Sequence, residues 1–285
     1  MRVATTPCCS AASMLDLLAL ASRVAITETA ILIEGEAGTG KGVLAAVIHQ
    51  RSLRRLQPLH VLDCVALAAG RDADVLGQIA DQHAGLQPRR GALGQGGAGT
   101  LLLDEVGALP PELQRALLRV LDQRTVRRIG ADGVHRIDVR IVASSSSDLR
   151  AAVRAGRFRA DLFQRLAVVR LPVPPLRERR GEVARLVGAH LPSPAAVPPD
   201  VLAALEAHAW PGNVRELRSV VEHQRMFGWA SALEAYRIAP APLDVPLAPR
   251  LGEADCAALA RFEADHCAFL LGRLGRTRVP VAISR

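Results

Sequence analysis

A glycine-rich loop carries the only lysine of the chain and has the composition of a phosphate-binding loop. It reads Gly-Glu-Ala-Gly-Thr-Gly-Lys at residues 35–41 and stands between an apolar run and a helical pattern. Glycines let backbone N–H groups curl around phosphate oxygens, the N-terminus of a helix adds a favourable dipole, and a lysine reaches the β- and γ-phosphates. We therefore predict that a nucleotide is bound by Gly35, Glu36, Ala37, Gly38, Thr39, Gly40, Lys41 and Gly42.

Two adjacent acids follow a second apolar run further along the chain. Thr100-Leu-Leu-Leu leads directly into Asp104 and Glu105. One carboxylate at this place can hold Mg²⁺, directly or through water, and the other can polarise the water that attacks the γ-phosphate. Alone, such a pair is a weak signal because acids are common where helices begin. After a phosphate loop it predicts Mg²⁺ binding by Asp104, catalysis by Glu105, and ATP with Mg²⁺ as the cofactors.

Alternating strand and helix patterns must position these residues. Four apolar runs have the length of buried strands, at 29–33, 59–62, 100–103 and 137–143. Apolar residues at helical spacing occupy three stretches around and between them, at 14–24, 41–51 and 111–122. This alternation favours an α/β fold with a largely parallel sheet.

The strand pattern stops after Pro175, and a helical unit is expected to follow. Its helices are predicted at 181–192, 199–208 and 213–227. Residues 239–249 contain four prolines in eleven positions, which is typical of a linker. We expect one more helix at about 253–274. The predicted domains are therefore an α/β domain at 1–176, a helical domain at 177–238, a linker at 239–252 and a C-terminal segment at 253–285.

The motifs together resemble the central AAA+ ATPase domain of sigma-54-dependent transcriptional activators, the bacterial enhancer-binding proteins. The resemblance covers roughly residues 14–230 and rests on GEAGTGKG with IHQRS, GTLLLDEVGALPPELQRALLRVLDQ, RRIG with IDVRIVAS, GRFRADLFQRL, PPLRERR and WPGNVREL. It implies a P-loop AAA+ three-layer sandwich followed by a small helical lid. It also implies a hexameric ring that uses ATP in transcription regulation, and the N-terminal LLALASRVA is similar to flagellar members.

The resemblance assigns roles to three arginines. Arg159 and Arg165 match the family arginines that act as fingers on the ATP of the neighbouring subunit, and Arg215 matches the lid arginine that senses nucleotide. Six residues of helix give a net rotation of about 240°, so Arg159 and Arg165 cannot share one helix face and should have different roles. The alternative is a solvated basic helix, because arginines commonly lie on exposed faces. Residues 151–185 hold nine arginines against three acids, an excess that the resemblance places at a subunit interface.

Near the nucleotide the sequence departs from the family. The Ser or Thr that normally follows the lysine and binds Mg²⁺ is Gly42. The family asparagine that holds the catalytic glutamate is Asp63, whose carboxylate we expect to repel Glu105 unless one of the two is protonated. The first sensor, Thr-Asn in the family, is Ser145-Ser146. These changes predict that the coupling of hydrolysis to motion is altered.

The regions that contact the family's partners are changed as well. The loop that binds sigma-54 through GAFTGA is matched by residues 81–86, which keep the fifth glycine as Gly85 but have His83 and Ala84 in place of the aromatic residue and threonine. This argues against sigma-54 RNA polymerase as a partner. After Leu251 the chain resembles the opening of a Fis-like helix-turn-helix without its recognition helix, and such a remnant cannot read a major groove. We therefore expect no sequence-specific DNA binding by this chain alone.

Composition bounds the class of protein. With 36 basic and 28 acidic residues the formal net charge is +8, and the 49% hydrophobic and 22% charged residues are typical of a globular protein rather than a disordered one. No apolar run approaches the roughly 18 to 20 residues of a membrane span, and the N-terminus lacks the order of a secretory signal. We expect a cytoplasmic protein without a membrane partner. The five cysteines have no metal-binding or disulfide spacing.

Three functions remain open. The first is an ATP-binding and ATP-hydrolysing module that acts as a ring in transcription regulation. The second is a degenerate relative that binds ATP and modulates a complete activator by mixed assembly, without contacting sigma-54. The third is an AAA+ ATPase that remodels a different protein. The retained Lys41, Asp104 and Glu105 favour ATP chemistry in all three, whereas the changed loop and the incomplete C-terminal motif favour the second or third.

Overall fold

The computed structural model describes residues 14–69, 76, 91, 93, 98–128, 130, 133–179, 181–191 and 197–239. By their internal contacts these residues divide into two units. The α/β unit comprises Leu20–Gly35 and Lys41–Pro172. The helical unit comprises residues 173–239 together with Glu36–Gly40 and the first residues described. The five residues Glu36–Gly40 of the predicted phosphate loop thus belong, by their contacts, with the helical unit, while the domain boundary expected at residue 176 stays a prediction.

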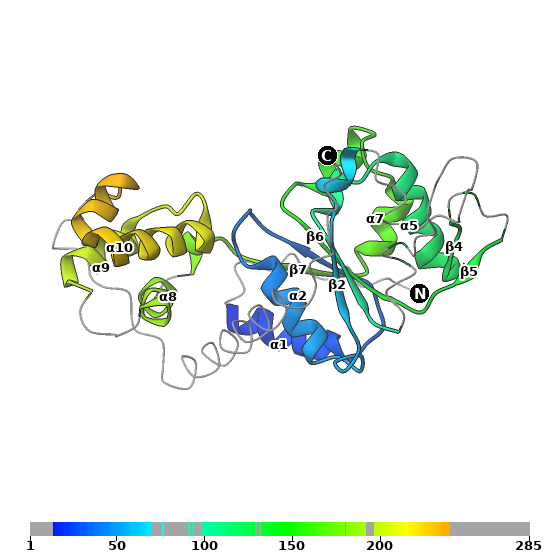
Figure 1. Ribbon diagram of the computed structural model, residues 1–285, viewed down its shortest axis with the longest axis horizontal. Helices are drawn as coiled ribbons and strands as arrows, with labels where there is room; N and C mark the ends of the chain where they lie inside the picture. Colours follow the sequence, from blue (N-terminus) through cyan, green and yellow to red (C-terminus); the bar gives the residue numbers. More distant parts are fainter. Residues whose placement is uncertain are drawn as a thin grey trace, which may run out of the picture. The chain divides into compact units, whose positions relative to one another are not determined.

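A parallel sheet forms the centre of the α/β unit (Figure 1). The described residues form five strands in the order β2-β3-β6-β1-β7, and every neighbouring pair is parallel. The strands are β1 (Ile31–Glu34), β2 (Leu59–Asp63), β3 (Thr100–Asp104), β6 (Arg140–Ser145) and β7 (Val169–Pro172). The prediction of an α/β fold with a parallel sheet is confirmed. Three of the apolar runs supply the central strands β1, β3 and β6, whose faces are buried, while the run at 59–62 forms the partly exposed edge strand β2.

Two details of the strands differ from expectation. The run predicted at 137–143 begins pairing in the sheet only at Arg140. Residues 137–139 connect β6 to a small antiparallel hairpin of β4 (Thr125–Val126) and β5 (His135–Arg136). The edge strand β7 was not predicted. Its residues alternate in exposure and include Arg170, so no apolar run marks it in the sequence.

Helices cover the sheet on both faces. The helices are α1 (Met14–Ala25), α2 (Lys41–Gln50), α5 (Pro111–Gln123), α6 (Leu149–Arg154) and α7 (Ala160–Leu166), with a 3₁₀ turn, η2 (Val106–Ala108), after β3. The helices α5 and α7 pack with Leu101 and Leu103 in one buried cluster, and alternation along β3 directs Leu102 to the opposite face. Of the apolar stripe predicted on α5, Leu113, Leu117 and Val120 are buried. Burying each such side chain contributes about 1.5–3 kcal/mol.

The helical unit has a fully buried tryptophan, Trp210, in its core. Its helices are α8 (Glu182–His190), α9 (Pro199–Ala207) and α10 (Asn213–Ala235). The Trp210 ring is fully buried, and its Nε1 donates a hydrogen bond of 2.8 Å to the carbonyl of Leu205. The helix expected to end at residue 227 continues to Ala235 beyond a kink at Gly228, where φ is +82°. Glycine adopts this angle without strain, so the chain bends there and does not stop.

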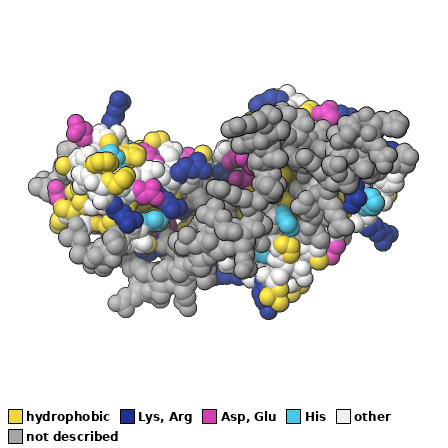
Figure 2. Space-filling model, in the orientation of Figure 1, with side chains coloured by type: hydrophobic (Ala, Val, Ile, Leu, Met, Phe, Trp, Pro, Cys, Tyr) yellow, Lys and Arg dark blue, Asp and Glu magenta, His cyan; other side chains and the backbone are white. Residues whose placement is uncertain are grey.

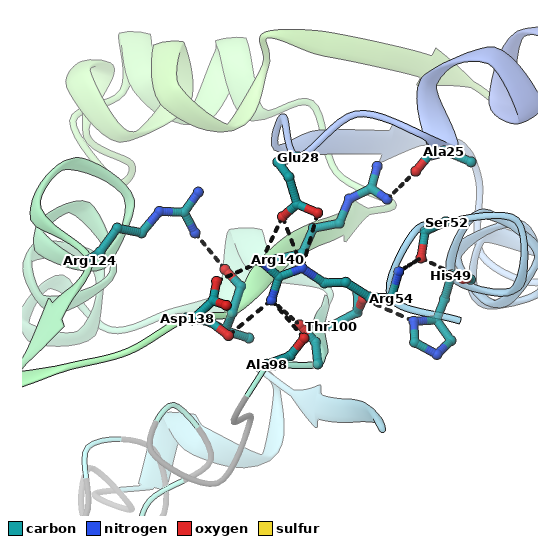
Figure 3. Close-up of polar contacts among 12 residues, drawn as sticks. Ala25, Glu28, His49, Ser52, Arg54, Ala98, Thr100, Arg124, Asp138 and Arg140 are labelled. Carbon is teal, nitrogen blue, oxygen red and sulfur yellow. Dashed lines mark hydrogen bonds and ion pairs between the residues drawn. The ribbon is translucent and has the colours of Figure 1, made fainter. Parts of the chain in front are cut away.

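Two arginines bind together the amino ends of the central strands (Figure 3). Arg140 is 1% exposed and donates to the carbonyls of Ala25 and Val24, at 2.5 and 3.0 Å, at the C-terminus of α1. Arg54 binds Glu28 at 2.8 Å and Asp138 at 2.6 Å. It also donates to the carbonyls of Ala98, Gly99 and Asp138. We call this group the amino-end cluster.

In the part of the chain that the structure describes, no helix combines the length and the apolar character needed to cross a membrane.

Candidate nucleotide site

The predicted phosphate loop connects a buried strand to a helix, as the sequence indicates. β1 lies between β6 and β7, and α2 begins at Lys41 directly after the loop. The amide of Gly35 donates to the carbonyl of Ser145 at 3.2 Å, which ties the start of the loop to the end of β6. Gly38 and Gly40 have φ angles of +79° and +98°. These left-handed angles suit glycine and let the chain turn within a few residues.

Lys41 lies at the N-terminus of α2 and is nearly buried. Its side chain is 6% exposed, and Nζ donates to the carbonyl of Gly35 at 2.9 Å. Nζ also lies 3.2 Å from Oε1 of Glu105. A buried ammonium needs such partners, because an unpaired charge in the interior is costly. The structure therefore brings the lysine of the loop and the second acid of the 104–105 pair together.

The two acids lie where β3 ends. Ser144, on the neighbouring strand β6, donates through Oγ to Oδ1 of Asp104 and accepts the amide of Glu105 at 3.2 Å. Glu105 has φ +55° and ψ +53°, a left-handed conformation that is uncommon for residues other than glycine. Such backbone conformations are retained where the surrounding structure fixes them, frequently at functional sites. Here the turn carries the Glu105 side chain to Lys41.

The other oxygen of Glu105 is held by a serine whose role the sequence did not reveal. The amide and the Oγ of Ser146 both donate to Oε2 of Glu105, at 2.7 and 2.8 Å. Burial by itself raises the pKa of Glu105, but the two hydrogen bonds from Ser146 and the charge of Lys41 outweigh it and lower the pKa below its ordinary value. In the sequence Ser146 marks only a departure from the family sensor, although a serine hydroxyl can always donate a hydrogen bond.

Asp63 has a different neighbour from the one expected. Its Oδ1 accepts the amides of Val65 and Ala66, at 2.9 and 3.4 Å, in the turn that follows β2. This is the ordinary behaviour of an aspartate that begins a turn. The repulsion expected from Asp63 does not dominate at Glu105, because the pKa of the glutamate is lowered and the described side chains that bind it are Lys41 and Ser146.

Three further residues hold the loop segment 36–39 within the helical unit. Arg177 forms a two-pronged pair with Glu36, at 2.9 and 2.6 Å. Asn213 donates to Glu36 Oε2 and to the carbonyl of Ala37, both at 3.1 Å. Arg179 donates to the carbonyl of Thr39 at 2.8 Å. We call Arg177, Arg179 and Asn213 the clasp.

The clasp was missed in the sequence although its residues lie in two of the quoted motifs, PPLRERR and WPGNVREL. Hydrogen bonds from Arg177 and Asn213 lower the pKa of Glu36 to about 2. Asn213 is fully buried and its Oδ1 accepts the amide of Leu176 at 2.8 Å. A buried side-chain amide with three partners is well satisfied, so Asn213 holds the loop rigidly.

Arg215 lies beside the same loop. A Cβ placed on Gly38 would lie 2.2 Å from the carbonyl oxygen of Gly212 and 3.1 Å from Cβ of Arg215, so this position accepts only glycine. The guanidinium of Arg215 is exposed and makes no hydrogen bond or ion pair with the described residues. Its location beside Gly38 agrees with a residue that contacts a ligand bound at the phosphate loop. The role of Arg215 in sensing nucleotide stays a prediction.

The two proposed finger arginines lie apart from Lys41. Arg159 precedes α7, pairs with Asp161 at 2.7 Å, and its amide donates to Gln114 at 2.9 Å. Arg165 lies in the last turn of α7 and pairs with Asp122 of α5 at 2.8 Å. Both guanidinium groups are exposed. Arg159 has an extended backbone before α7, so the rotation expected for six helical residues does not describe this pair, and their different roles stay a prediction.

The arginine excess in 151–185 is largely paired within the chain. Besides Arg159, Arg165 and Arg177, four others lie within ion-pair distance of carboxylates: Arg154 with Asp148, Arg170 with Glu34, and Arg179 and Arg185 with Glu182. On the face drawn in Figure 2, basic side chains of the described residues are interspersed with acidic and uncharged ones. The excess is therefore not one open basic patch, which argues against a simple electrostatic footprint for nucleic acid.

The residues present fit a nucleoside triphosphate better than its metal ion. The glycine turn, the amides at the start of α2 and the buried Lys41 are suited to phosphate. For Mg²⁺ the chain offers Asp104, while a Cβ at Gly42 would meet nothing within 4 Å, so the place of the usual hydroxyl is open space.

Several predicted features lie outside the described residues. They are the loop at 81–86, the linker from residue 240, the Fis-like segment at 253–285 and the cysteines other than Cys64, which is buried.

Family models match almost the whole described chain. Residues 8–172 match the model described as "Sigma-54 interaction domain", and residues 177–242 match "AAA+ ATPase lid domain". Among curated relatives, the regulatory protein AtoC of Escherichia coli is 37% identical over 220 residues, covering 74% of this chain and 48% of AtoC. The response regulator protein FleR of Pseudomonas aeruginosa is 42% identical over 219 residues, covering 73% and 46%. This chain thus spans about half the length of these relatives.

Solved structures agree with the family matches. NtrX from Brucella abortus in complex with ATP aligns with a TM-score of 0.69 and 31% identity over 95% of this chain and 64% of that one. The same protein in complex with ADP aligns with a TM-score of 0.70 and 29% identity over 94% and 67%. These matches confirm the resemblance and the α/β AAA+ fold predicted from the motifs.

Proposed function

This chain belongs to the sigma-54 interaction domain family, and from that premise we propose that it binds ATP with Mg²⁺ and hydrolyses it to ADP and phosphate. The observation that carries the proposal is the contact between Lys41 and Glu105, 3.2 Å apart at the carboxyl end of the sheet. A buried lysine at a helix N-terminus serves phosphate binding, and a carboxylate beside it serves activation of water. The ATP-bound NtrX structure supports the same ligand class.

Each residue would have one task in this reaction. The loop amides and Lys41 would bind the β- and γ-phosphates, and Asp104 would hold Mg²⁺, through water, to balance the phosphate charge. Glu105 would accept a proton from the attacking water as the oxygen–phosphorus bond forms and the bond to the β-phosphate oxygen breaks. Arg215 would bind the nucleotide beside Gly38.

The arginines of α7 are proposed to act between subunits. Arg159 and Arg165 are exposed and pair only with surface carboxylates of the described residues, which they can exchange for phosphate at little cost. The family resemblance implies a hexameric ring. In such a ring the two arginines would approach the ATP of the neighbouring subunit. The established range for such a finger is about 10³ to 10⁵ in rate.

The whole protein is proposed to act in transcription regulation as a self-assembled ring. Sigma-54 RNA polymerase is the partner that family membership suggests, while the sequence at 81–86 argues against it. The open space at Gly42 favours a second candidate function, in which the chain binds ATP with weakened Mg²⁺ contact and modulates a complete activator in mixed rings.

A mixing experiment tests hydrolysis and ring assembly together. The ATPase rate per subunit should rise with protein concentration, and Arg159→Ala should lower it about 10³-fold. Glu105→Gln should be inactive because it lacks the carboxylate. When the two variants are mixed, Arg159 from the Glu105→Gln subunits can reach intact sites on the Arg159→Ala subunits, so activity should exceed that of either alone.

A matched control is Arg157→Ala, an exposed arginine two positions before Arg159 to which the resemblance assigns no finger role. It should leave the rate unchanged. A rate that is flat in concentration and no recovery on mixing would refute action between subunits. Binding of ATP without turnover in the wild type would favour the second candidate function.

A further inference from the structure

The strands β2 and β6 lie on either side of β3, and the residue that follows β6, Ser146, hydrogen-bonds to the Glu105 carboxylate. β2 ends at Asp63, directly opposite Asp104 in the sheet, and its carboxylate is bound to its own turn. β6 ends beside Glu105 on the other side of β3, and Ser146 places both a backbone and a side-chain donor on one glutamate oxygen. Hydrogen bonds to a carboxylate are about twice as strong as neutral ones, so a pair on one oxygen fixes the orientation of the group.

The segment that carries Ser146 is itself well supported. A Cβ on Gly107 would lie 2.7 Å from Ser147 Oγ, so this glycine lets the serine segment pack closely against η2. Directly after it, Asp148 caps α6 by accepting the amides of Arg150 and Ala151, at 2.8 and 3.1 Å. The Ser146 donors are therefore held from both sides by the fold.

We propose that Ser146 is the positioning residue for Glu105, taking the part that the resemblance would give to a residue at the end of β2. The inference rests on the proposed ATP hydrolysis. With Oε2 fixed by Ser146, Oε1 on the Lys41 side is the oxygen that accepts the proton of the attacking water. That water's oxygen bonds to the γ-phosphorus while ADP leaves. Two-point fixation keeps Oε1 in the correct direction throughout.

Three variants test the role through kinetics. Ser146→Ala removes one of the two donors, so kcat should fall about tenfold while KM for ATP stays unchanged, since orientation of a catalytic carboxylate affects the reaction and not binding. Ser146→Thr keeps the hydroxyl and should restore kcat. Asp63→Asn keeps the Oδ1 that caps its turn and serves as the matched control on the other flanking strand, so it should leave both constants unchanged.

The outcomes separate the alternatives. An unchanged or increased kcat in Ser146→Ala, or a loss that Ser146→Thr does not restore, overturns the proposal. A tenfold loss in Asp63→Asn together with none in Ser146→Ala would place the positioning role on β2 instead.

A second readout does not depend on activity. In ¹⁵N-serine-labelled protein, the Ser146 amide is assigned by its loss in Ser146→Ala. A hydrogen bond to a charged carboxylate should shift this amide proton downfield, and Glu105→Gln should move it upfield. If the wild type hydrolyses no ATP, the proposed function fails while the amide shift still decides the contact. An amide proton that does not respond to Glu105→Gln overturns the inference.

Discussion

The same two strands, β3 and β6, carry a polar cluster at each end, and the clusters differ in how their cations are satisfied. In the amino-end cluster, Arg140 is bound by two carbonyls of α1. Arg54 has carbonyls and two carboxylates as partners. Backbone carbonyls are permanent parts of the fold, so these arginines cannot exchange their partners without local unfolding.

At the carboxyl ends, Lys41 is paired with a carboxylate that has its own chemical task. Its contacts include the carbonyl of Gly35 and Oε1 of Glu105. Glu105 is itself kept in place by Ser146, so it can leave the lysine without losing its position. The contrast indicates that an arginine bound to backbone carbonyls marks a structural cluster, whereas a lysine paired with a carboxylate marks a site able to accept a ligand.

The largest effect should come from Lys41→Ala. Loss of its charged hydrogen bonds to phosphate should weaken ATP binding about 10³-fold, or about 4 kcal/mol, because each such bond contributes about 1.5–3 kcal/mol. Isothermal titration calorimetry measures the affinity, and circular dichroism checks that the helices persist. Unchanged ATP affinity would show that Lys41 does not bind phosphate, and the two clusters would then not differ in function.

The matching change at the other end is Arg140→Met. It fills much of the same volume but leaves the carbonyls of Ala25 and Val24 without donors, so the free energy of unfolding should fall by about 3 kcal/mol. Urea denaturation followed by circular dichroism measures this loss. ATP affinity of the folded variant should equal that of the wild type. A selective loss of ATP affinity with full stability would show that the amino-end cluster is not merely structural.

Asn213→Ala should change both properties, because the clasp joins the fold to the loop. Three hydrogen bonds are lost from a buried site, so stability should fall by about 2 kcal/mol, and ATP affinity should fall because the 36–39 segment is released. Asn213→Asp keeps the acceptor for Leu176 but places a second charge beside Glu36, so it should weaken binding further. Equal ATP affinity in all three proteins would show that the clasp does not shape the phosphate loop.

Sequence reasoning recovered the parts of this molecule that follow local rules. Glycines before a lysine at a helix start, and acids after an apolar strand, have fixed neighbours along the chain, and the structure joins Lys41 to Glu105. The buried central strands were found by their apolar runs. The edge strand β2 has such a run, whereas the edge strand β7 contains the exposed Arg170 and was missed. The helix predicted at 213–227 continues beyond Gly228, because glycine permits a kink without ending the helix.

Long-range partners were not predictable in the same way. Ser146 and Glu105 are 41 positions apart, and Arg177 and Glu36 are 141 apart, so only the fold brings them together. The Asp63 assignment failed for a related reason. A position matched to a family asparagine gives no information on the direction of the new side chain, and two nearby amides in its own turn bind it more readily.

The smallest expected effect is the pH dependence of the pair between Arg177 and Glu36. The pKa of Glu36 in the folded protein, about 2, lies below its ordinary value of 4.5, so the pair stabilises the fold fully above about pH 4.5, and this contribution is lost as the pH falls toward 2. Thermal unfolding of the wild type and of Glu36→Gln should therefore differ at pH 7 and converge as the pH is lowered from 4.5.

Because both side chains are more than a third exposed, the difference should also shrink in high salt. Arg54, by contrast, is only 13% exposed and binds three carbonyls and two carboxylates of the fold, so Arg54→Ala should keep its stability difference in high salt. A Glu36→Gln difference that grows on acidification would mean that the folded protein favours the protonated form, and the clasp would then have to be regarded as a neutral hydrogen-bond network instead of an ion pair.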